Sequence, residues 1–256
     1  MDLSCELGDV NLDGDITILD IIIGIDAIFD NAYNPLLDLN SDGLINIFEY
    51  KLESLAANQL LHCLTETEQR EMQRFVQQAD QMRFLYARAH LRKLLAERFS
   101  LEPTAVMLQT GDHGKLSSSN CPIHFNIAHS GDWVVIALDV EKFVGVDVEF
   151  MRRKVNIMDL AARFFHAQEF SALKALPQAL QQKSFFYTWV CKEAVIKCDG
   201  RGLSLGLENF AVNVDPRLAA ELIVPPPDTA LSNWHLNVWQ CAPEYYCASA
   251  IADSGA

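Results

Sequence analysis

Apolar residues recur at helical spacing over residues 60–99, and neither proline nor glycine interrupts this stretch. The pattern predicts two helices, with Thr65 or Thr67 available as the N-cap of the first. On spacing alone, the basic residues of this stretch form either a solvated face or a binding surface. They are Arg70, Arg74, Arg83, Arg88, Arg92, Lys93 and Arg98.

Runs rich in β-branched residues follow the predicted helices. Residues 124–131 lead into a second run at 133–140, and a short polar turn at Glu141 and Lys142 separates that run from a third at 144–150. The second and third runs are predicted to form a β-hairpin across this turn. Further strands are predicted near the C-terminus, at residues 210–214, 220–224, 235–240 and 245–252.

Two carboxylates lie on the third β run. Because side chains alternate along a strand, Asp147 and Glu149 share one face while Val146 and Val148 point to the core. Neighbouring carboxylates on one face repel each other unless a cation lies between them. Asp147 and Glu149 are therefore candidate metal ligands.

A helical pattern covers residues 185–203, and Gly-Arg-Gly near its end predicts a terminating turn. Trp189, Glu193 and Lys197 follow one another at intervals of four residues, so they lie on one face of this helix. Glu193 and Lys197 alone are equally compatible with a stabilising surface ion pair.

The composition is that of a globular protein of one to three domains: 256 residues, of which 50% are apolar and 21% charged. No run of 18 uninterrupted apolar residues occurs, which excludes a predicted membrane span.

The acidic N-terminus lacks the pattern of a secretory signal, so a cytoplasmic protein is expected. Seven cysteines without a CxxC pair predict reduced, mostly buried thiols, of which only Cys191, beside Lys192, is a candidate nucleophile.

Negative charge is concentrated in the first quarter of the chain. The whole chain carries a formal charge of −14, and residues 1–58 hold nine aspartates and three glutamates against a single lysine. This balance argues against nucleic acid as a general partner. The asymmetry predicts a domain boundary near residue 58.

The acidic quarter contains a repeat with an offset of 29 residues. In each copy a glycine, Gly14 or Gly43, takes the sixth place of a 12-residue loop, as the sharp turn of a calcium loop requires. The expected Ca²⁺ ligands are Asp9, Asn11, Asp13, Asp15, Thr17 and Asp20 in the first loop. In the second they are Asp38, Asn40, Asp42, Leu44, Asn46 and Glu49. A pair of acidic solvated turns is the alternative.

The order of loop then helix, twice, resembles the dockerin modules of cellulosome-type assemblies over about residues 6–56. This resemblance implies a small all-α module with two calcium sites and a cohesin-like partner. Dockerin loops usually end in Asp, as at Asp20, whereas Glu49 is the choice of an EF-hand.

The segments FNIAHSGDW, GVDVE and WVCKEAVIK occur in this order along the remaining chain. Together they closely resemble the 4′-phosphopantetheinyl transferases of the surfactin-synthetase-activating type. The resemblance implies an α+β fold made of a pseudo-twofold pair of similar halves, here residues 59–150 and 151–256. It also implies coenzyme A in the cleft between the halves and a monomer without a nucleic-acid or membrane partner.

The implied reaction moves the phosphopantetheine arm of coenzyme A onto a serine of an apo acyl or peptidyl carrier protein and releases adenosine 3′,5′-bisphosphate. By resemblance, Asp147, Glu149 and Glu193 are Mg²⁺ ligands. Glu193 is also the general base that activates the serine, directly or through a metal-bound water. Lys197 neutralises the diphosphate and is placed to protonate the leaving oxygen, with added charge from Lys192.

The remaining implied residues surround the coenzyme. His129 and Ser130 match contacts to its phosphates, and Glu169 is placed near the metal. A histidine held in the core by hydrogen bonds is the alternative for His129. The basic groups expected around the adenosine and its 3′-phosphate are Arg83, Arg88 and Lys115.

Two departures from the family pattern bear on these expectations. The family begins with a strand and a helix, and the calcium-loop segment occupies that place, so the opening strand is expected to be missing. Leu116 stands where the family has proline after Gly-Lys. The alternative function is therefore a degenerate transferase body that serves as a calcium-dependent docking protein.

Overall fold

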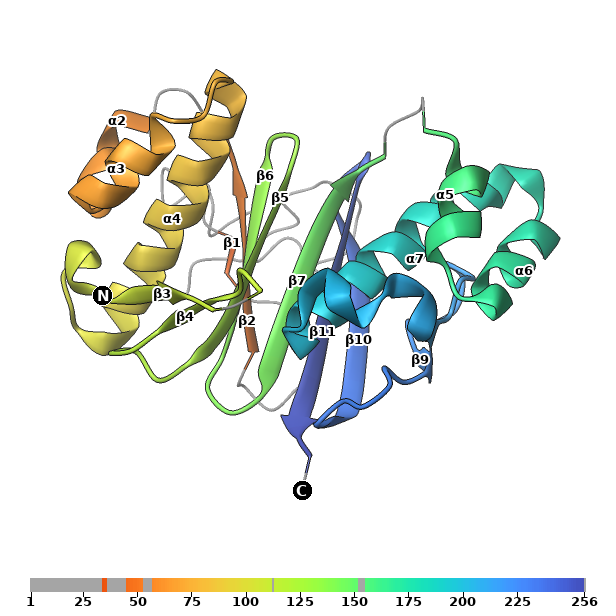
Figure 1. The fold of residues 1–256 in the computed structure, drawn as a ribbon. Helices are drawn as coiled ribbons and strands as arrows, with labels where there is room; N and C mark the ends of the chain where they lie inside the picture. The colour runs from red at the N-terminus through yellow and green to blue at the C-terminus, as the bar shows by residue number, and fades with distance from the viewer. Residues whose placement is uncertain (1–33, 36–44, 53–56, 112, 152–154, 256) are drawn as a thin grey trace, which may run out of the picture.

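A computed structural model describes most of the chain after the acidic quarter (Figure 1). The ranges it describes are residues 34–35, 45–52, 57–111, 113–151 and 155–255. They form two α+β halves, and each half packs a 22-residue helix against an antiparallel sheet. The predicted α+β class is therefore confirmed, whereas the small all-α module predicted before it lies mostly outside the described residues.

The first half contains a four-stranded sheet in the order β1-β2-β6-β5. Its strands are β1 (Asn34–Pro35), β2 (Ile45–Lys51), β5 (His124–Ser130) and β6 (Trp133–Asp139), beside a small pair β3 (Leu108–Thr110) and β4 (Leu116–Ser118). Its helices are α2 (Ala57–Leu60), α3 (Glu66–Met72) and α4 (Gln78–Phe99), with 3₁₀ turns at Leu61–Cys63 and Pro103–Ala105. Thr65 caps α3 in a reciprocal capping box with Glu68, which confirms the predicted helix start.

In the second half, a three-stranded sheet has the order β10-β11-β7. Its strands are β7 (Phe143–Phe150), β10 (Leu231–Ala242) and β11 (Tyr245–Ser254), beside a small pair β8 (Ala211–Val212) and β9 (Leu222–Val224). The helices are α5 (Ile157–Phe164), α6 (Ala167–Ala175) and α7 (Gln178–Asp199), with 3₁₀ turns at Gly202–Leu205 and Leu207–Asn209. Gly200 ends α7 in the left-handed region at φ 88°, which confirms the predicted turn.

The layers follow the order helix, sheet, sheet, helix. One apolar core lies between α4 and the first sheet, and a second lies around α7 and its own sheet. A third core joins the two sheets and includes Ile47, Val135, Val146 and Val148. Figure 1 shows α4 and α7 on opposite sides of the strands. The inner faces of the two sheets therefore hold the halves together.

Strand β2 corrects the expectation for the second calcium loop. Residues 45–51 form a strand along the whole of β6, where a loop leading into a helix was predicted. Phe48 and Tyr50 are buried in the core of the first half, and Ile47 in the core between the sheets. Burial on both faces favours a strand, because an isolated helix here would leave these side chains in water. The first half therefore does have a strand before its helices, and the prediction that it was missing was wrong.

The predicted calcium ligands divide between two regions. Asn46 and Glu49 lie on β2, and the Glu49 carboxylate accepts a hydrogen bond from the Trp239 indole on β10. Glu49 thus contacts the second half of the protein. The other predicted ligands lie outside the described residues: Asp9, Asn11, Asp13, Asp15, Thr17, Asp20, Asp38, Asn40, Asp42 and Leu44.

The predicted hairpin between β6 and β7 was also wrong. Strand β6 pairs with β5 and β2, whereas β7 leaves the first sheet and pairs with β11. The close turn lies instead between β5 and β6, where Gly131 adopts φ 54°. Its missing side chain leaves room for the Tyr245 ring, which a Cβ atom there would overlap.

Two predictions about composition can be compared with the described part of the chain. Six free cysteines occur there and all but Cys241 are buried, as predicted. Burial raises the pKa of the Cys191 thiol, so this residue does not have the properties of a nucleophile. No helix among the described residues is long and apolar enough to cross a membrane.

Candidate active site

A glycine allows strand β7 and helix α7, which carry the candidate site residues, to pack closely together. Gly145 lies on the face of β7 that meets α7, and a Cβ atom there would collide with the main chain of Ala194 and Cys198. Because Gly145 has no side chain, the helix lies directly against the strand. The next two residues on the same face of β7 are Asp147 and Glu149, which confirms their predicted shared face.

The Asp147 carboxylate is buried and forms an ion pair with α7. Its Oδ1 atom lies 2.6 Å from the Nζ atom of Lys197. Its Oδ2 atom is also buried and has no hydrogen-bond partner among the described residues. Burial raises the pKa of Asp147, while the Lys197 ammonium acts in the opposite direction.

Glu193 lies one helical turn before Lys197 on the same face of α7. Its pKa is raised, first by burial and then by the negative charge of Asp147, and the Lys197 charge partly offsets both. A carboxylate in such surroundings holds a proton more readily than one in water. The role of Glu193 as the general base stays a prediction.

The three predicted Mg²⁺ ligands are not assembled into a metal cage. Among the residues that the structure describes, no three His, Cys, Asp or Glu side chains are grouped closely enough to hold a metal ion. Two of the three have other partners, since Asp147 pairs with Lys197 and Glu149 accepts a hydrogen bond of 3.1 Å from Ser130.

Ser130 lies at the seam between the two halves. Its hydroxyl donates to Glu149 and accepts from the main-chain N–H of Phe150 at 3.1 Å. Further along the same seam, the Asn126 amide oxygen accepts from the N–H of Val146 at 2.8 Å. Hydrogen bonds between side chains of β5 and the main chain of β7 thus take the place of a main-chain hydrogen-bond ladder between these strands. The contact of Ser130 with the coenzyme and that of Glu149 with a metal stay predictions.

His129 and Arg83 lie on the first-half side of this seam. His129 is exposed, yet its pKa is lowered, first by partial loss of solvent around the ring and then by the charges of Lys197 and Arg83. The Arg83 guanidinium donates to the Gly131 carbonyl at 2.8 Å and to Asp80 at 2.6 Å. These contacts hold Arg83 at the turn that follows His129 and Ser130.

Arg88 and Lys115 have protein partners elsewhere. The Arg88 guanidinium faces α3, 4.0 Å from the Glu68 carboxylate. The Lys115 ammonium donates to three main-chain carbonyls: Val144 at 3.2 Å, Lys197 at 2.7 Å and Cys198 at 3.1 Å. Lys115 therefore caps the C-terminus of α7, and its contact with the coenzyme stays a prediction, as does that of Arg88.

Lys192 and Glu169 form a buried ion pair. The Lys192 ammonium is fully buried and contacts the Glu169 carboxylate at 2.7 Å and the Phe210 carbonyl at 2.6 Å. Glu169 also accepts from the N–H of Val212 at 2.7 Å. This pair joins α6, α7 and β8 inside the second half. Lys192 is thus neutralised inside the second half, where charge beside the diphosphate was expected, and the placement of Glu169 near a metal stays a prediction.

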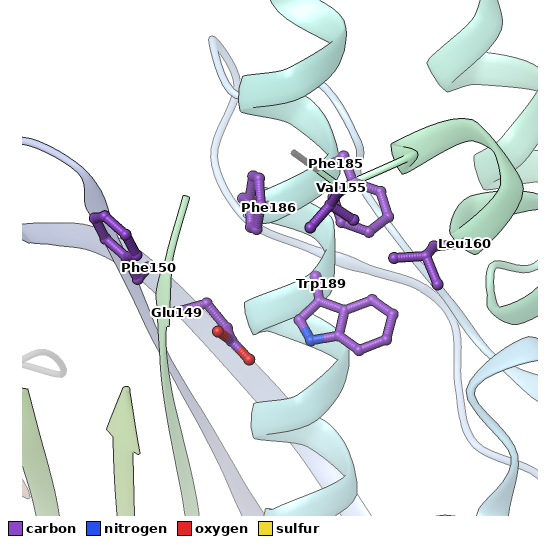
Figure 2. A pocket seen from close by; sticks show the side chains of 7 residues that line it. All are labelled: Glu149, Phe150, Val155, Leu160, Phe185, Phe186 and Trp189. Atoms are coloured by element: carbon purple, nitrogen blue, oxygen red, sulfur yellow. The ribbon is translucent and has the colours of Figure 1, made fainter. Parts of the chain in front are cut away.

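A pocket of about 210 Å³ lies beside Glu149, between β7 and the helices α5 and α7. Figure 2 shows the Glu149 carboxylate directed toward Trp189 across this space. The apolar wall consists of Phe150, Val155, Leu160, Phe185, Phe186 and Trp189. Of these only Trp189 was expected on the active face. The run of aromatic residues before Trp189 was the available sequence signal for Phe185 and Phe186. A glycine within a β-branched strand was the signal for Gly145.

Known proteins match both halves of the chain. A family model described as the 4′-phosphopantetheinyl transferase superfamily matches residues 143–250, and one described as the N-terminal part of a 4′-phosphopantetheinyl transferase matches residues 53–141. The 4′-phosphopantetheinyl transferase Sfp of Bacillus subtilis is 32% identical over 182 residues, which cover 70% of this chain and 78% of that protein. The chain belongs to the 4′-phosphopantetheinyl transferase superfamily. It is an enzyme of this class.

A second curated transferase and a solved structure are also similar to parts of this chain. The 4′-phosphopantetheinyl transferase HetI of a Nostoc strain is 30% identical over 211 residues, or 81% of this chain and 83% of that protein. A solved holo-(acyl-carrier-protein) synthase from Bacillus anthracis, in complex with coenzyme A, is 21% identical. The match covers 44% of this chain and 98% of the synthase chain, with a TM-score of 0.38.

Proposed function

We propose that this enzyme transfers the 4′-phosphopantetheine arm of coenzyme A to a serine hydroxyl of an apo acyl or peptidyl carrier protein. The observation that carries the proposal is the convergence of Asp147, Glu193 and Lys197 where β7 meets α7, beside an apolar pocket. The lysine suits a reaction in which negative charge develops on a diphosphate, and the carboxylates are suited to accept a proton or to bind a cation.

In the proposed reaction, the serine oxygen attacks the phosphorus atom that bears the pantetheine arm. A new serine O–P bond forms, and the bond from this phosphorus to the oxygen of the adenosine 5′-phosphate breaks. Glu193 accepts the serine proton, consistent with its raised pKa. Lys197 neutralises the departing phosphate and supplies its proton, and adenosine 3′,5′-bisphosphate is released.

The chemistry of the residues present also suits a divalent cation, although their carboxylates would have to move closer together to surround it. Asp147 Oδ2 is a buried acceptor without a partner among the described residues, and an oxygen of this kind is a suitable ligand for Mg²⁺. Asp147, Glu149 and Glu193 would hold the ion. When bound, Mg²⁺ would supply positive charge to the diphosphate under attack.

Positioning of the coenzyme falls to groups on both sides of the seam. His129, Ser130 and Arg83 surround the first-half side and are suited to contact its phosphates. The apolar pocket beside Glu149 is suited to the pantetheine arm, because that arm is uncharged. Occupation of this pocket would also keep water away from the phosphorus atom under attack.

Mass spectrometry of an apo carrier domain incubated with the enzyme, coenzyme A and Mg²⁺ tests the proposal. A mass gain equal to one phosphopantetheine arm on the carrier serine is expected. Glu193→Gln should slow this transfer by about 10²- to 10⁴-fold without unfolding the protein. The exposed Glu221→Gln serves as the matched control. Absence of any gain with several carriers, in a folded enzyme, would contradict the proposal.

The pH dependence gives a second test of Glu193 as the base. A base acts only in its deprotonated form, and the pKa of Glu193 lies above 4.5. The transfer rate should therefore fall as the pH drops toward this raised value, before ordinary glutamates titrate. A rate–pH profile of the wild type would check this. An acidic limb at or below 4.5 would assign the base to another group.

The calcium-dependent docking alternative has less support. Two of its proposed ligands, Asn46 and Glu49, belong to a strand of the transferase sheet, so the second loop cannot end in the expected helix. Asp147, Glu193 and Lys197 are all present, Lys197 pairs with Asp147, and both charges act on Glu193, which also argues against a degenerate body.

A further inference from the structure

The Lys197 ammonium is placed where several charged groups meet. It lies 2.6 Å from Asp147 Oδ1, and its charge acts on both Glu193 and His129. The side chain of Lys197 is 28% exposed, whereas that of Asp147 is only 7% exposed. The lysine therefore reaches inward from solvent to neutralise a buried carboxylate. Repulsion between Asp147 and Glu193 would otherwise be uncompensated at this point.

We propose that Lys197 is an internal competitor for the divalent cation: its ammonium occupies Asp147 until the cation displaces it toward the coenzyme diphosphate. This inference rests on the proposed function, because it assumes that Asp147 binds the cation. It goes further in giving Lys197 two alternating partners. The same side chain balances the carboxylates in the resting enzyme and the diphosphate during transfer.

Charge balance supports the exchange. The unpartnered Oδ2 atom of Asp147 would accept a cation, but the Lys197 ammonium at Oδ1 repels it, so binding includes the work of moving Lys197 away. The displaced ammonium is then free to pair with an anion. Occupation of the two sites is consequently coupled, and by linkage coenzyme A should favour the cation as much as the cation favours coenzyme A.

Titration calorimetry with Mg²⁺ alone, in the absence of coenzyme A, tests the competition. Lys197→Met removes the competitor and should bind Mg²⁺ about tenfold more tightly than the wild type. Arg83→Met is the matched control, because Arg83 also acts on His129 but contacts Gly131 and Asp80 instead of Asp147. Its Mg²⁺ affinity should change much less. Equal tightening in both variants would indicate a general charge effect and overturn direct competition.

Lysine labelling of the wild-type protein tests the same displacement without a variant that could misfold. Acetylation of lysine amines, followed by peptide mass spectrometry, reports how accessible each ammonium is. The labelling rate of Lys197 should rise when Mg²⁺ is added, because the displaced side chain moves into solvent. Lys192 is fully buried, so its rate should stay low and provides an internal reference. A Lys197 rate that stays constant or falls would overturn the proposal.

Failure of this inference can be distinguished from failure of the proposed function. If Mg²⁺ binds no more tightly to Lys197→Met than to the wild type, or binds to neither, competition is overturned. The transfer reaction is scored separately by the mass of the carrier domain with the full chain. An active wild type with unchanged Lys197 labelling would retain the transferase and remove only the exchange of partners.

Discussion

At the scale of single residues, three lysines near α7 have three different environments. Lys197 reaches Asp147 in the candidate active site, and Lys192 is fully buried against Glu169. The Lys115 ammonium donates its hydrogen bonds to main-chain carbonyls. Charge alone does not separate these roles. What separates them is the direction in which each side chain leaves its helix or strand.

Glu49→Gln tests the position of Glu49 inside the transferase body. Burial raises the pKa of Glu49, so just above pH 4.5 the folded state holds a proton that the unfolded chain has released. The wild type therefore loses stability as the pH rises through this range. Glutamine keeps an acceptor for the Trp239 indole and removes the charge, so the variant should gain stability relative to the wild type as the pH rises. Urea denaturation at several pH values measures this difference, and a constant difference would contradict it.

Lys115→Met tests the cap at the end of α7. Its loss leaves the carbonyls of Lys197 and Cys198 without their donor and should lower the free energy of unfolding by about 1–3 kcal/mol. Lys115→Arg retains the charge and is expected to recover part of this loss. Chemical denaturation of both variants checks the size. If instead stability is unchanged and the KM for coenzyme A rises, Lys115 acts on the coenzyme as the resemblance implies.

At the scale of elements, the site depends on how closely α7 approaches β7. The helix supplies Glu193 and Lys197 and the strand supplies Asp147 and Glu149, so the distance between the two elements decides whether these groups interact. Gly145 makes the close approach possible. The buried Lys192–Glu169 pair holds another face of α7 and so limits its rotation.

Gly145→Ala should disturb both stability and activity. The added methyl group meets the main chain of Ala194 and Cys198, which cannot move aside as a flexible side chain would. Such overpacking typically costs about 1–3 kcal/mol, and the helix is also displaced from Asp147. Urea denaturation and carrier modification measure the two effects. Gly114→Ala is a useful comparison because a Cβ atom there has open space, although its φ of 83° adds some backbone strain. Unchanged values for Gly145→Ala would show that the helix does not need this contact.

At the scale of the whole molecule, two sheets packed face to face join the halves, and the active groups lie along their seam. Residues from β2, β6, β7 and β11 share the core between the sheets. Strand β2 contributes to this core and to that of the first half, so the acidic quarter and the transferase body are not separate at residues 45–51.

Phe48→Ala tests whether β2 is part of the transferase. Phe48 is only 6% exposed and lies in the core of the first half, so truncation should cost about 3–5 kcal/mol. Val76→Ala is the control, because Val76 is 93% exposed and its truncation should change stability by less than about 0.5 kcal/mol. Thermal unfolding of the full chain compares them. If the Phe48 variant were as stable as the Val76 variant, β2 would belong to an independent N-terminal module and not to the transferase body.

The sequence by itself determined the main helices, most strands and the central acidic groups. Periodicity was sufficient to place Asp147 and Glu149 on one strand face and Glu193 and Lys197 on one helix face, because both properties depend only on local geometry. The specific order of the three motifs then indicated the family, which the relatives confirm.

Only the tertiary structure decided which distant segments pair. The calcium-loop spacing at residues 38–49 is compatible with several local conformations, and the edge of β6 selects the strand at residues 45–51. The same non-local pairing sends β7 to β11 instead of back to β6. Lys192 turned out to be buried because the packing of α7 against α6 and β8 decides which of its faces is inside. Local spacing carries no information about these partners, since strand pairing and helix orientation depend on contacts between residues far apart in the chain.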